Sequence, residues 1–526
     1  MPKILLSSVC QPFGEKHGDG LGTHYAGSWQ ILWAQGIYRP TTTTTQWGID
    51  FIAENLKAPV VTLHYPTIKD FIKEIKRGYD YIGIAFVYST ARKMIKMVNV
   101  IRKHAPNSKI ILGGYGTTLG KHLEPYADYI CKEEGVKFMR KLLGEDVNKP
   151  IIQPNITSVS KLFSIPLQKD GYVFIGLGCP NGCDFCATSA FFNRKHIKFL
   201  PTGKSIYDAI IRLREINGKD LTSFYFSDED FLLNKKQVQE FHQCVKQSDL
   251  PPLSIQTYGS VKALSKLSIK MLVEIGVDFV WIGYEGKHAG YHKQQGKSYK
   301  ELFTELKSHG ISILASMILG FDYQTTEIIQ EEFDELMELK PTMCQFLIYG
   351  PAFGTPLFDR LNAENRLLPN LFEQPFNFSN IVDGYYLGFK HPNIEANEME
   401  NIQRSLYKEE FARLGSGAFR KIEDRLIGYK SLKSHSFKRI KEKAEYFGKS
   451  AHEALQLMDA SKMYLTEHQK NILTQLQREI EQETGKMTIK ENIISKLVYP
   501  LVWWEDKKIK YNINQQPKFT RNEYRI

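Results

Sequence analysis

Three cysteines lie close together in residues 178–188, which read GCPNGCDFCAT. They are Cys179, Cys183 and Cys186, and their spacing is C-x-x-x-C-x-x-C. Iron–sulfur clusters are held by cysteine thiolates, and a four-iron cluster bound wholly by protein takes four of them. Three thiolates on one loop can therefore bind three irons and leave the fourth open. The spacing predicts a [4Fe-4S] cluster with one reactive iron.

A structural zinc site is the alternative interpretation of the same cysteines. Such sites usually close with four ligands, often supplied as two C-x-x-C pairs. No second pair lies nearby in the sequence. The remaining cysteines are scattered, and we expect them to be reduced core residues. They are Cys10, Cys131, Cys244 and Cys344.

The whole chain has 526 residues, enough for several domains with cores of their own. Its formal net charge is +11, but no nucleic-acid-binding motif accompanies this charge, so we expect no nucleic-acid partner. No apolar run has the length of a membrane span, and the first residues do not resemble a secretory signal. We therefore expect a cytoplasmic protein, in the reducing compartment that suits an oxygen-sensitive cluster.

The first part of the chain alternates apolar strands with amphipathic helices. Expected strands are residues 3–9, 58–66, 79–89, 108–116 and 127–135, with helices over 67–78 and 91–107. This order predicts a doubly wound parallel sheet, an α/β domain over residues 1–145. Residues 20–57 interrupt it with Trp29, Trp33 and Trp47, which either pack in a core or cover the cofactor and substrate entrance.

A second α/β unit follows a Pro-rich segment, residues 146–168, that we interpret as a linker. Six expected strands alternate with helical patterns, which predicts a partial (β/α)6 TIM-type barrel over residues 169–390. The strands are residues 172–178, 223–227, 253–258, 279–283, 312–319 and 343–348. The cysteine loop follows the first strand, at the end of the barrel where such folds place their chemistry.

The cysteine motif on such a barrel resembles the signature of the radical S-adenosylmethionine (SAM) superfamily. The resemblance implies that the open iron binds SAM and that the reduced cluster cleaves it to a 5′-deoxyadenosyl radical. Segments after strands two, four and five resemble the superfamily's SAM-binding motifs, and a Gly-Thr-Pro-Leu loop after strand six is similar too. The resemblance implies SAM contacts for Phe185, Ser227, Asp228, Asp230, Glu285 and Leu319. It also implies an electron donor of the flavodoxin or ferredoxin type.

The first domain, directly before this barrel, resembles the cobalamin-binding domain of cobalamin-dependent radical SAM enzymes. Glycines after the fourth strand and an acidic-glycine pair after the fifth carry the resemblance. It implies cobalamin contacts for Gly113, Gly114, Gly116, Thr117, Glu134 and Gly135. The D-x-H-x-x-G motif, which supplies a histidine to cobalt in many cobalamin proteins, is absent. A retained fold without cofactor therefore stays open.

The last part of the chain, residues 391–526, is expected to be a helical domain outside the resemblance. Near its end Trp503 and Trp504 precede Lys507, Lys508 and Lys510. Tryptophan beside lysine suits a membrane interface, although a final helix docked on the barrel explains the pattern equally simply. Peripheral membrane contact would make a lipid substrate attractive.

These observations predict a radical SAM enzyme with cobalamin that transfers a methyl group to an unactivated carbon of a small-molecule or lipid substrate. Two other hypotheses remain. One is a radical SAM reaction without methylation, such as cyclisation, rearrangement, oxidation or carbon–carbon coupling. The other is a cluster or cobalamin sensor without catalysis, for which absence of SAM cleavage would be the sign.

Overall fold

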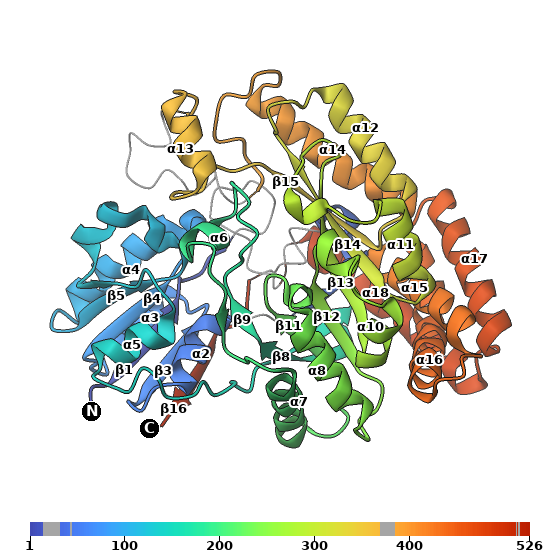
Figure 1. Cartoon of the computed structure of the whole chain (residues 1–526), viewed down its shortest axis with the longest axis horizontal. Coiled ribbons are helices and arrows are strands. Elements are labelled where there is room, and N and C mark those ends of the chain that lie inside the picture. The colour runs from blue at the N-terminus through green and yellow to red at the C-terminus, as the bar shows by residue number, and fades with distance from the viewer. Residues whose placement is uncertain (14–31, 43–44, 369–383, 512, 514–515, 526) are drawn as a thin grey trace.

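The computed structural model describes residues 1–13, 32–42, 45–368, 384–511, 513 and 516–525. Figure 1 shows an N-terminal α/β domain at the left, a curled sheet with outer helices in the centre, and a helical region at the right. This order matches the predicted α/β class of a doubly wound domain followed by a partial barrel and helices.

The N-terminal domain is built on a parallel sheet with strand order β3-β1-β4-β5-β6. This is the 2-1-3-4-5 order of flavodoxin-like folds, whose ligands bind beyond the carboxyl ends of the strands. The strands are β1 (Ile4–Ser8), β3 (Val60–His64), β4 (Tyr81–Ala85), β5 (Lys109–Gly113) and β6 (Tyr129–Ile130).

Helices cover both faces of this sheet, because alternate strand residues point to opposite sides. Ile4 and Leu6 share a core with α2 (Trp47–Glu54) and α5 (Gly135–Leu142). Leu5 packs on the other face with α3 (Ile68–Ile75) and α4 (Ala91–His104). Continuous apolar strands therefore form a sheet that is buried on both sides, as predicted.

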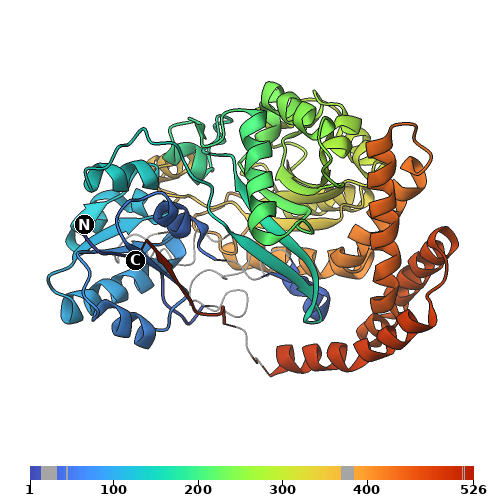
Figure 2. The ribbon, with the colours of Figure 1, turned by 90° about the horizontal axis from the view of Figure 1, so that it is seen from below.

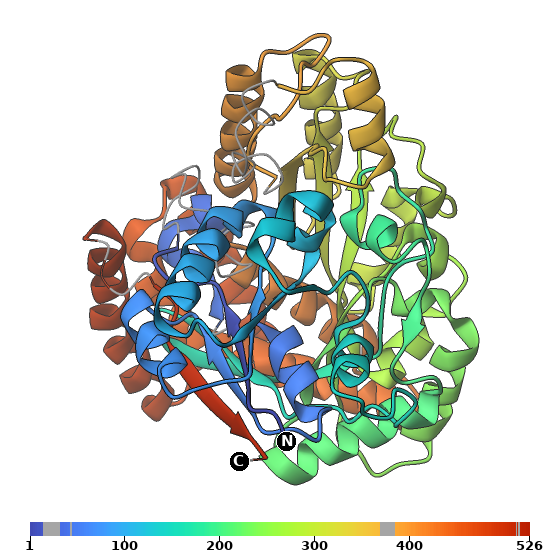
Figure 3. The same ribbon diagram turned by 90° about the vertical axis from the view of Figure 1, so that its left-hand side faces the viewer.

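The end of the chain departs from the expected helical domain. Strand β16 (Thr520–Tyr524) pairs antiparallel with β3 and extends the N-terminal sheet. Figure 3 shows this strand beside the N-terminal domain, with both termini close together. TRNEY carries no apolar alternation, so its sequence gives no strand signal. Long-range contacts hold this strand in place. The Nε and Nη2 groups of Arg521 each donate a hydrogen bond to the Glu74 carboxylate of α3 at 2.9 Å.

Removing this contact with Arg521→Ala is expected to lower the free energy of unfolding by about 2 kcal/mol at pH 7, the scale of hydrogen bonds to charged groups. Burial raises the pKa of Glu74, but hydrogen bonds from Arg521 and Tyr79 outweigh it and hold that pKa below 4.5. Because the folded pKa is depressed, this contribution is present at neutral pH and is lost as pH falls through the folded pKa. Urea unfolding at pH 7 and pH 3 measures it, with the exposed Lys518→Ala as control. An unchanged stability at pH 7 would show that β16 is not held by this pair.

The central sheet contains six parallel strands in the order in which they follow along the chain, as the barrel prediction requires. They are β8 (Ile165–Phe174), β11 (Ser223–Ser227), β12 (Ser254–Tyr258), β13 (Val277–Glu285), β14 (Ser312–Leu319) and β15 (Met343–Ile348). Outer helices pack on them around one core. These are α7 (Gly203–Asn217), α8 (Lys235–Lys246), α9 (Val261–Leu264), α10 (Ile269–Ile275), α11 (Tyr299–Ser308) and α12 (Thr326–Glu338).

The segment interpreted as a linker is partly sheet. Strand β7 (Thr157–Leu162) forms a hairpin with β8, and β2 (Thr41–Thr42) pairs with β7, so the sheet continues for two more antiparallel strands. The linker interpretation is corrected here, because the Pro-rich residues before 157 hid the alternating pattern of Thr157–Leu162. Because of this hairpin, β8 begins at Ile165, five residues before its buried part begins at Asp170.

Helices of the C-terminal region close the open side of the curled sheet, as Figure 2 shows from below. They are α14 (Ala396–Leu414), α15 (Gly417–Leu432), α16 (Lys438–Ser461), α17 (Glu467–Thr484) and α18 (Ile489–Lys510), and α13 (Pro356–Ala363) follows the last strand. A buried ion pair joins α16 to the barrel: Lys443 Nζ lies 2.8 Å from Asp278 Oδ2 of β13. The region is therefore a wall of the barrel.

Candidate active site

The cysteine loop leaves the barrel after β8 and β9 (Gly176–Leu177) and ends at α6 (Ala187–Phe191). Gly178 begins it with φ of 90°, and a Cβ there would lie 2.2 Å from the Lys195 carbonyl oxygen. Only glycine fits this turn. Ser189 Oγ donates to the Cys179 carbonyl at 2.9 Å and accepts from the Gly182 N–H at 3.2 Å, so α6 holds the loop from inside.

The outer part of the loop is tied to the far side of the barrel through Asp184. Its carboxylate accepts hydrogen bonds from the Tyr291 and Tyr349 hydroxyls, at 2.6 and 2.7 Å. Phe185 packs edge-on against the same two rings, with centroids 5.5 and 5.7 Å away. The loop is therefore fixed before any ligand binds.

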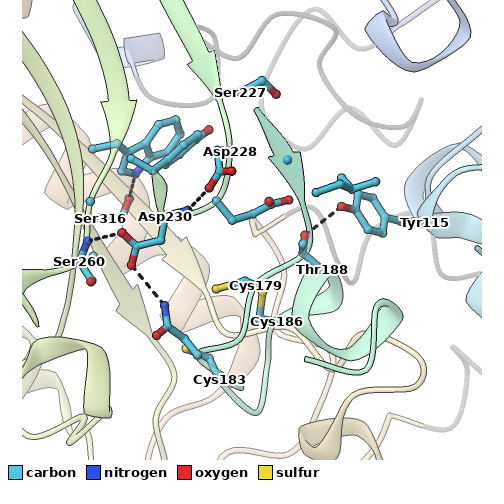
Figure 4. Close-up of a pocket in the computed structure, with 18 of the residues that line it drawn as sticks. Tyr115, Cys179, Cys183, Cys186, Thr188, Ser227, Asp228, Asp230, Ser260 and Ser316 are labelled. Carbon is cyan, nitrogen blue, oxygen red and sulfur yellow. Dashed lines mark hydrogen bonds between the residues drawn. The ribbon is translucent and has the colours of Figure 1, made fainter. Parts of the chain in front are cut away.

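All three predicted cysteines line one cavity of about 750 Å³ at the carboxyl ends of the barrel strands. Figure 4 shows their sulfur atoms turned toward the same space. Burial raises the pKa of Cys179 and of Cys183 to about 11, so a bound metal must supply the charge that makes them thiolates. Across the described part of the chain, no three Cys, His, Asp or Glu side chains group as ligands of one metal ion. Three thiols spread around a common cavity fit the ligand set of a cluster rather than a zinc ion.

An acidic group from the end of β11 faces the cysteines. Ser227, Asp228 and Asp230 all line the cavity. Asp228 accepts from the Asp230 N–H at 3.0 Å and lies 2.8 Å from His196 Nε2, and this carboxylate raises the pKa of His196. Asp230 accepts from Asn181 of the cysteine loop at 3.4 Å. The structure therefore brings together the residues that the sequence placed after strand two (Figure 4).

Glu229, between these two aspartates, also lines the cavity. Burial, followed by the neighbouring Asp228 carboxylate, raises the pKa of Glu229 to about 7. Its buried Oε2 atom has no hydrogen-bond partner among the described residues. Glu229 is not among the site residues predicted from the sequence. Its position between Asp228 and Asp230 in the Ser-Asp-Glu-Asp run would have been enough to include it.

Glu285, predicted from the fourth strand, lines the same cavity and forms a buried ion pair with Lys293. Its φ is 60°, and the pairing of β13 with β14 shifts register between Gly283 and Glu285. A bulge of this kind re-aims a side chain at a functional site. Lys293 lies on the loop after β13, where no spacing in the sequence marks it.

Two predicted SAM contacts have different outcomes. Phe185 lines the cavity, where its ring also faces the Lys293 ammonium at 5.7 Å. The Leu319 side chain is fully buried in the barrel core and is absent from the described cavity wall, to which β14 contributes Ser316 and Ile318. Alternation along the strand turns the side chain of Ile318 to the cavity instead, and a SAM contact at Leu319 stays a prediction.

The N-terminal domain forms the opposite wall of the cavity through Tyr115, Glu134 and Gly135, together with α2. Thr188 of α6 donates to the Tyr115 hydroxyl at 3.0 Å and so joins the two domains across this wall, as Figure 4 shows. Glu134 accepts from the N–H groups of Val136 and Lys137 and caps α5. Two of the residues that the resemblance assigned to cobalamin thus face the cysteines.

The other four residues that the resemblance assigned to cobalamin are not among the described residues that line the cavity. They are Gly113, Gly114, Gly116 and Thr117. A Cβ at Gly114 would lie 2.5 Å from the Phe86 carbonyl oxygen, and one at Gly116 would lie 2.2 Å from the Phe86 ring. The Thr117 hydroxyl is buried and donates to backbone carbonyls of Gly114 and Cys131. Packing on Phe86 therefore explains these glycines without a cofactor, while Gly113 has open space beside it.

Of the three tryptophans in the long insertion, Trp47 lines the cavity and Trp33 packs against Tyr407 in the barrel wall, with ring centroids 6.0 Å apart. Trp29 lies outside the described residues. The insertion therefore contributes both to the cavity and to a core.

No family model matches the chain. Relatives at low identity include an uncharacterized methyltransferase of Pyrococcus horikoshii, 24% identical over 61% of this chain and 75% of its own length. Bacteriochlorophyllide d C-8(2)-methyltransferase of Chlorobaculum tepidum is 22% identical over 53% of this chain and 68% of its own. Hopanoid C-2 methylase of Rhodopseudomonas palustris is 23% identical over 61% and 63%.

Among solved structures, the radical SAM methyltransferase TsrM from Kitasatospora setae, determined with cobalamin and a [4Fe-4S] cluster, matches with a TM-score of 0.54. The match covers 86% of this chain and 99% of TsrM at 14% identity, so it establishes the fold. The fold expected from the resemblance, a doubly wound domain followed by a partial barrel, is confirmed by this match.

Proposed function

We propose that this protein is a radical SAM enzyme. The observation that carries the proposal is the placement of three cysteine thiols, on one preformed loop, in a cavity walled by carboxylates from β11 and β13. Cys179, Cys183 and Cys186 would hold a [4Fe-4S] cluster, which when bound and reduced would supply the electron for cleavage of SAM to a radical. The chain binds and shields these reactants: Asp230 and Glu285 offer acceptors for the SAM amino group and ribose hydroxyls, and Lys293 offers a donor for its carboxylate.

Methyl transfer with cobalamin is the reaction we propose for this site. Three of the relatives are named as methyltransferases or methylases, two others are named as anaerobic magnesium-protoporphyrin IX monomethyl ester cyclases, and TsrM was solved with cobalamin. The cavity lies between the barrel and the carboxyl ends of the N-terminal strands, where ligands of such sheets bind. Tyr115, Glu134 and Gly135 would contact cobalamin there, and no D-x-H-x-x-G histidine is available to bind cobalt.

The test is anaerobic reconstitution with iron, sulfide and hydroxocobalamin, followed by analysis of bound corrinoid and of SAM products. Bound corrinoid with S-adenosylhomocysteine and a methylated product supports methyl transfer. A cluster and 5′-deoxyadenosine without corrinoid would overturn it and favour the non-methylating radical reaction. Cluster and corrinoid without any SAM cleavage would favour the sensor. In the first two cases an electron donor of the flavodoxin or ferredoxin type is the partner we propose.

We also propose that α18 contacts a membrane surface. Among the described residues, no helix has the length and apolar character needed to cross a bilayer. Helix α18 nevertheless exposes large apolar side chains along most of its length, including Leu497, Trp503 and Trp504 at 64%, 49% and 46%. Lysines follow them in its last turn. Aromatic side chains beside lysines bind at anionic bilayer interfaces.

Replacing both Trp503 and Trp504 with alanine is expected to lower partitioning onto phosphatidylserine-containing vesicles about tenfold, because each ring buries apolar area at the interface. Co-sedimentation with vesicles at low and high salt measures the effect, and salt should weaken the binding. Phe437→Ala, at an equally exposed aromatic at the start of α16, is the matched control. Equal partitioning of the double variant and wild type would exclude α18 as the contact.

A further inference from the structure

A second cavity of about 780 Å³ lies inside the barrel below the cysteine cavity. Its walls come from the lower halves of the strands and from α15, α16 and α18, which close the open side of the curled sheet. Side chains such as Leu162, Phe279, Ala454, Leu457 and Val498 make much of this wall apolar. TIM-type barrels are normally filled with side chains at this level, so the space needs an explanation.

One layer of aromatic side chains separates the two cavities. Trp47, Tyr225, Tyr258 and Trp281 line both of them. The Tyr225 hydroxyl donates to the Tyr258 hydroxyl at 2.8 Å, and the Trp281 indole donates to Ser316 at 2.5 Å. A molecule in the second cavity would therefore lie one side-chain layer from the site of the proposed radical chemistry.

Two cations of α15 face this second cavity. The Lys421 ammonium makes no hydrogen bond or ion pair within the described ranges and lies 5.4 Å from the Phe279 ring centroid. Arg425 is only 7% exposed, and its buried Nε–H has no hydrogen-bond partner in the part of the chain that the structure describes. A donor left unpaired in a buried site is destabilising unless a ligand accepts from it.

The carboxylates near these two cations already have other partners. Asp278 is already paired with Lys443 at 2.8 Å and lies 3.9 Å from Arg425. Asp170 accepts from Gln168 and Ser223. Burial lowers the pKa of Lys421 to about 8, which still leaves it largely protonated at pH 7. Glu453, which also lines the cavity, lies 3.9 Å from Lys449, so the nearby carboxylates of Asp170, Asp278 and Glu453 all have other partners.

The mouth of the second cavity adjoins α18. Leu167 of the β7–β8 hairpin and Ile494 of α18 line the cavity and are 48% and 37% exposed. Ile494 is continuous with the exposed apolar side chains that we propose contact a membrane. An apolar molecule could pass from that surface into the cavity without crossing a polar surface.

We propose that the second cavity binds a long-chain carboxylic acid, with its carboxylate on Lys421 and Arg425 and its apolar body along α16 and α18. This inference goes beyond the proposed function: it assigns a ligand site for an amphiphilic acid beneath the cysteine cavity, from which the aromatic layer separates it. A carboxylate accepts from Lys421 and from the unpaired Arg425 N–H, and an apolar chain fills the rest of the wall.

The test uses the full chain without added cofactors and two fluorescent probes, cis-parinaric acid and the corresponding alcohol. Lys421→Met is expected to weaken binding of the acid about tenfold, the scale of one charge-assisted hydrogen bond, and to leave the alcohol unchanged. Lys441→Met, at an exposed lysine of α16 away from the cavity wall, is the matched control and should change neither. Leu457→Trp, at the half-buried cavity wall, should weaken both probes.

Equal affinity for acid and alcohol in the wild type, or an unchanged preference in Lys421→Met, would overturn the proposal. Binding of both probes that survives Leu457→Trp would also overturn it, because the probes would then lie elsewhere. Each variant's melting curve separates loss of the site from loss of the fold. SAM cleavage by reconstituted Lys421→Met protein in the absence of substrate should be retained. If the wild-type protein and the Lys421→Met variant both fail to cleave SAM, that result counts against the proposed function and not against this ligand site.

Discussion

The Cys183→Ala protein is expected to keep its fold and to lose its cluster and its reaction with SAM. With one thiolate removed, only two of the three ligand positions remain, so iron should fall from about four per chain to near zero. SAM cleavage should fall at least about a hundredfold, because no open iron is then held in the cavity. Iron analysis and the visible absorption of anaerobically reconstituted protein measure the first effect.

A matched control for this substitution is Cys244→Ala. Cys244 is a half-buried cysteine of α8 and lies apart from the described cavity wall. It should retain full iron and full SAM cleavage. Equal iron and activity in the Cys183 and Cys244 variants would remove the basis for the cluster assignment. If Cys183→Ala strongly lowers the melting temperature, Cys183→Ser takes its place, because serine preserves the side-chain volume. This variant should also lose the iron and the SAM cleavage.

Breaking the ion pair between Glu285 and Lys293 is expected to have the largest effect on stability. The Glu285 side chain is 4% exposed and that of Lys293 is 19% exposed. Removing one partner of a buried pair leaves an uncompensated charge and costs about 3–5 kcal/mol. Glu285→Ala and Lys293→Met should each show a loss of this size in urea unfolding, and the double variant should lose less than the sum of the two.

The neighbouring exposed pair of Lys287 and Glu335 provides the comparison. Their side chains are 43% and 41% exposed, so Lys287→Met should change stability by less than about 1 kcal/mol. Additive effects of the Glu285 and Lys293 substitutions would mean that the two side chains act independently. SAM binding by Glu285→Ala is measured without denaturant, at a temperature at which the variant stays folded. Weaker binding than in the wild type would place the pair in the cofactor site as well.

The parallel strands were predictable because each is a short apolar run bounded by turn residues. For β11, β14 and β15 the expected and observed bounds agree, since most positions in each strand are apolar and buried. The same argument failed for β16, whose polar TRNEY forms a strand only through its contacts with β3 and α3. Local periodicity carries no information about a partner that lies more than 400 residues away in the chain.

The candidate site was predictable where spacing within one loop defines it, as for the cysteines and the acidic run after β11. Lys293 was not, because only the folded loop brings it to Glu285. Gly114 and Gly116 were chosen for a cofactor, yet their neighbour Phe86 already requires glycine there. A glycine at such a position indicates that there is no room for a side chain. It does not indicate whether a cofactor or another part of the chain occupies the space.

Formation of 5′-deoxyadenosine from SAM by the anaerobically reconstituted, reduced protein is the most direct measurement of the central claim. The placement of Cys179, Cys183 and Cys186 around one cavity predicts this product in the wild type and its absence in Cys183→Ala. Wild-type protein that carries about four irons per chain and yields no 5′-deoxyadenosine would contradict radical chemistry at this site.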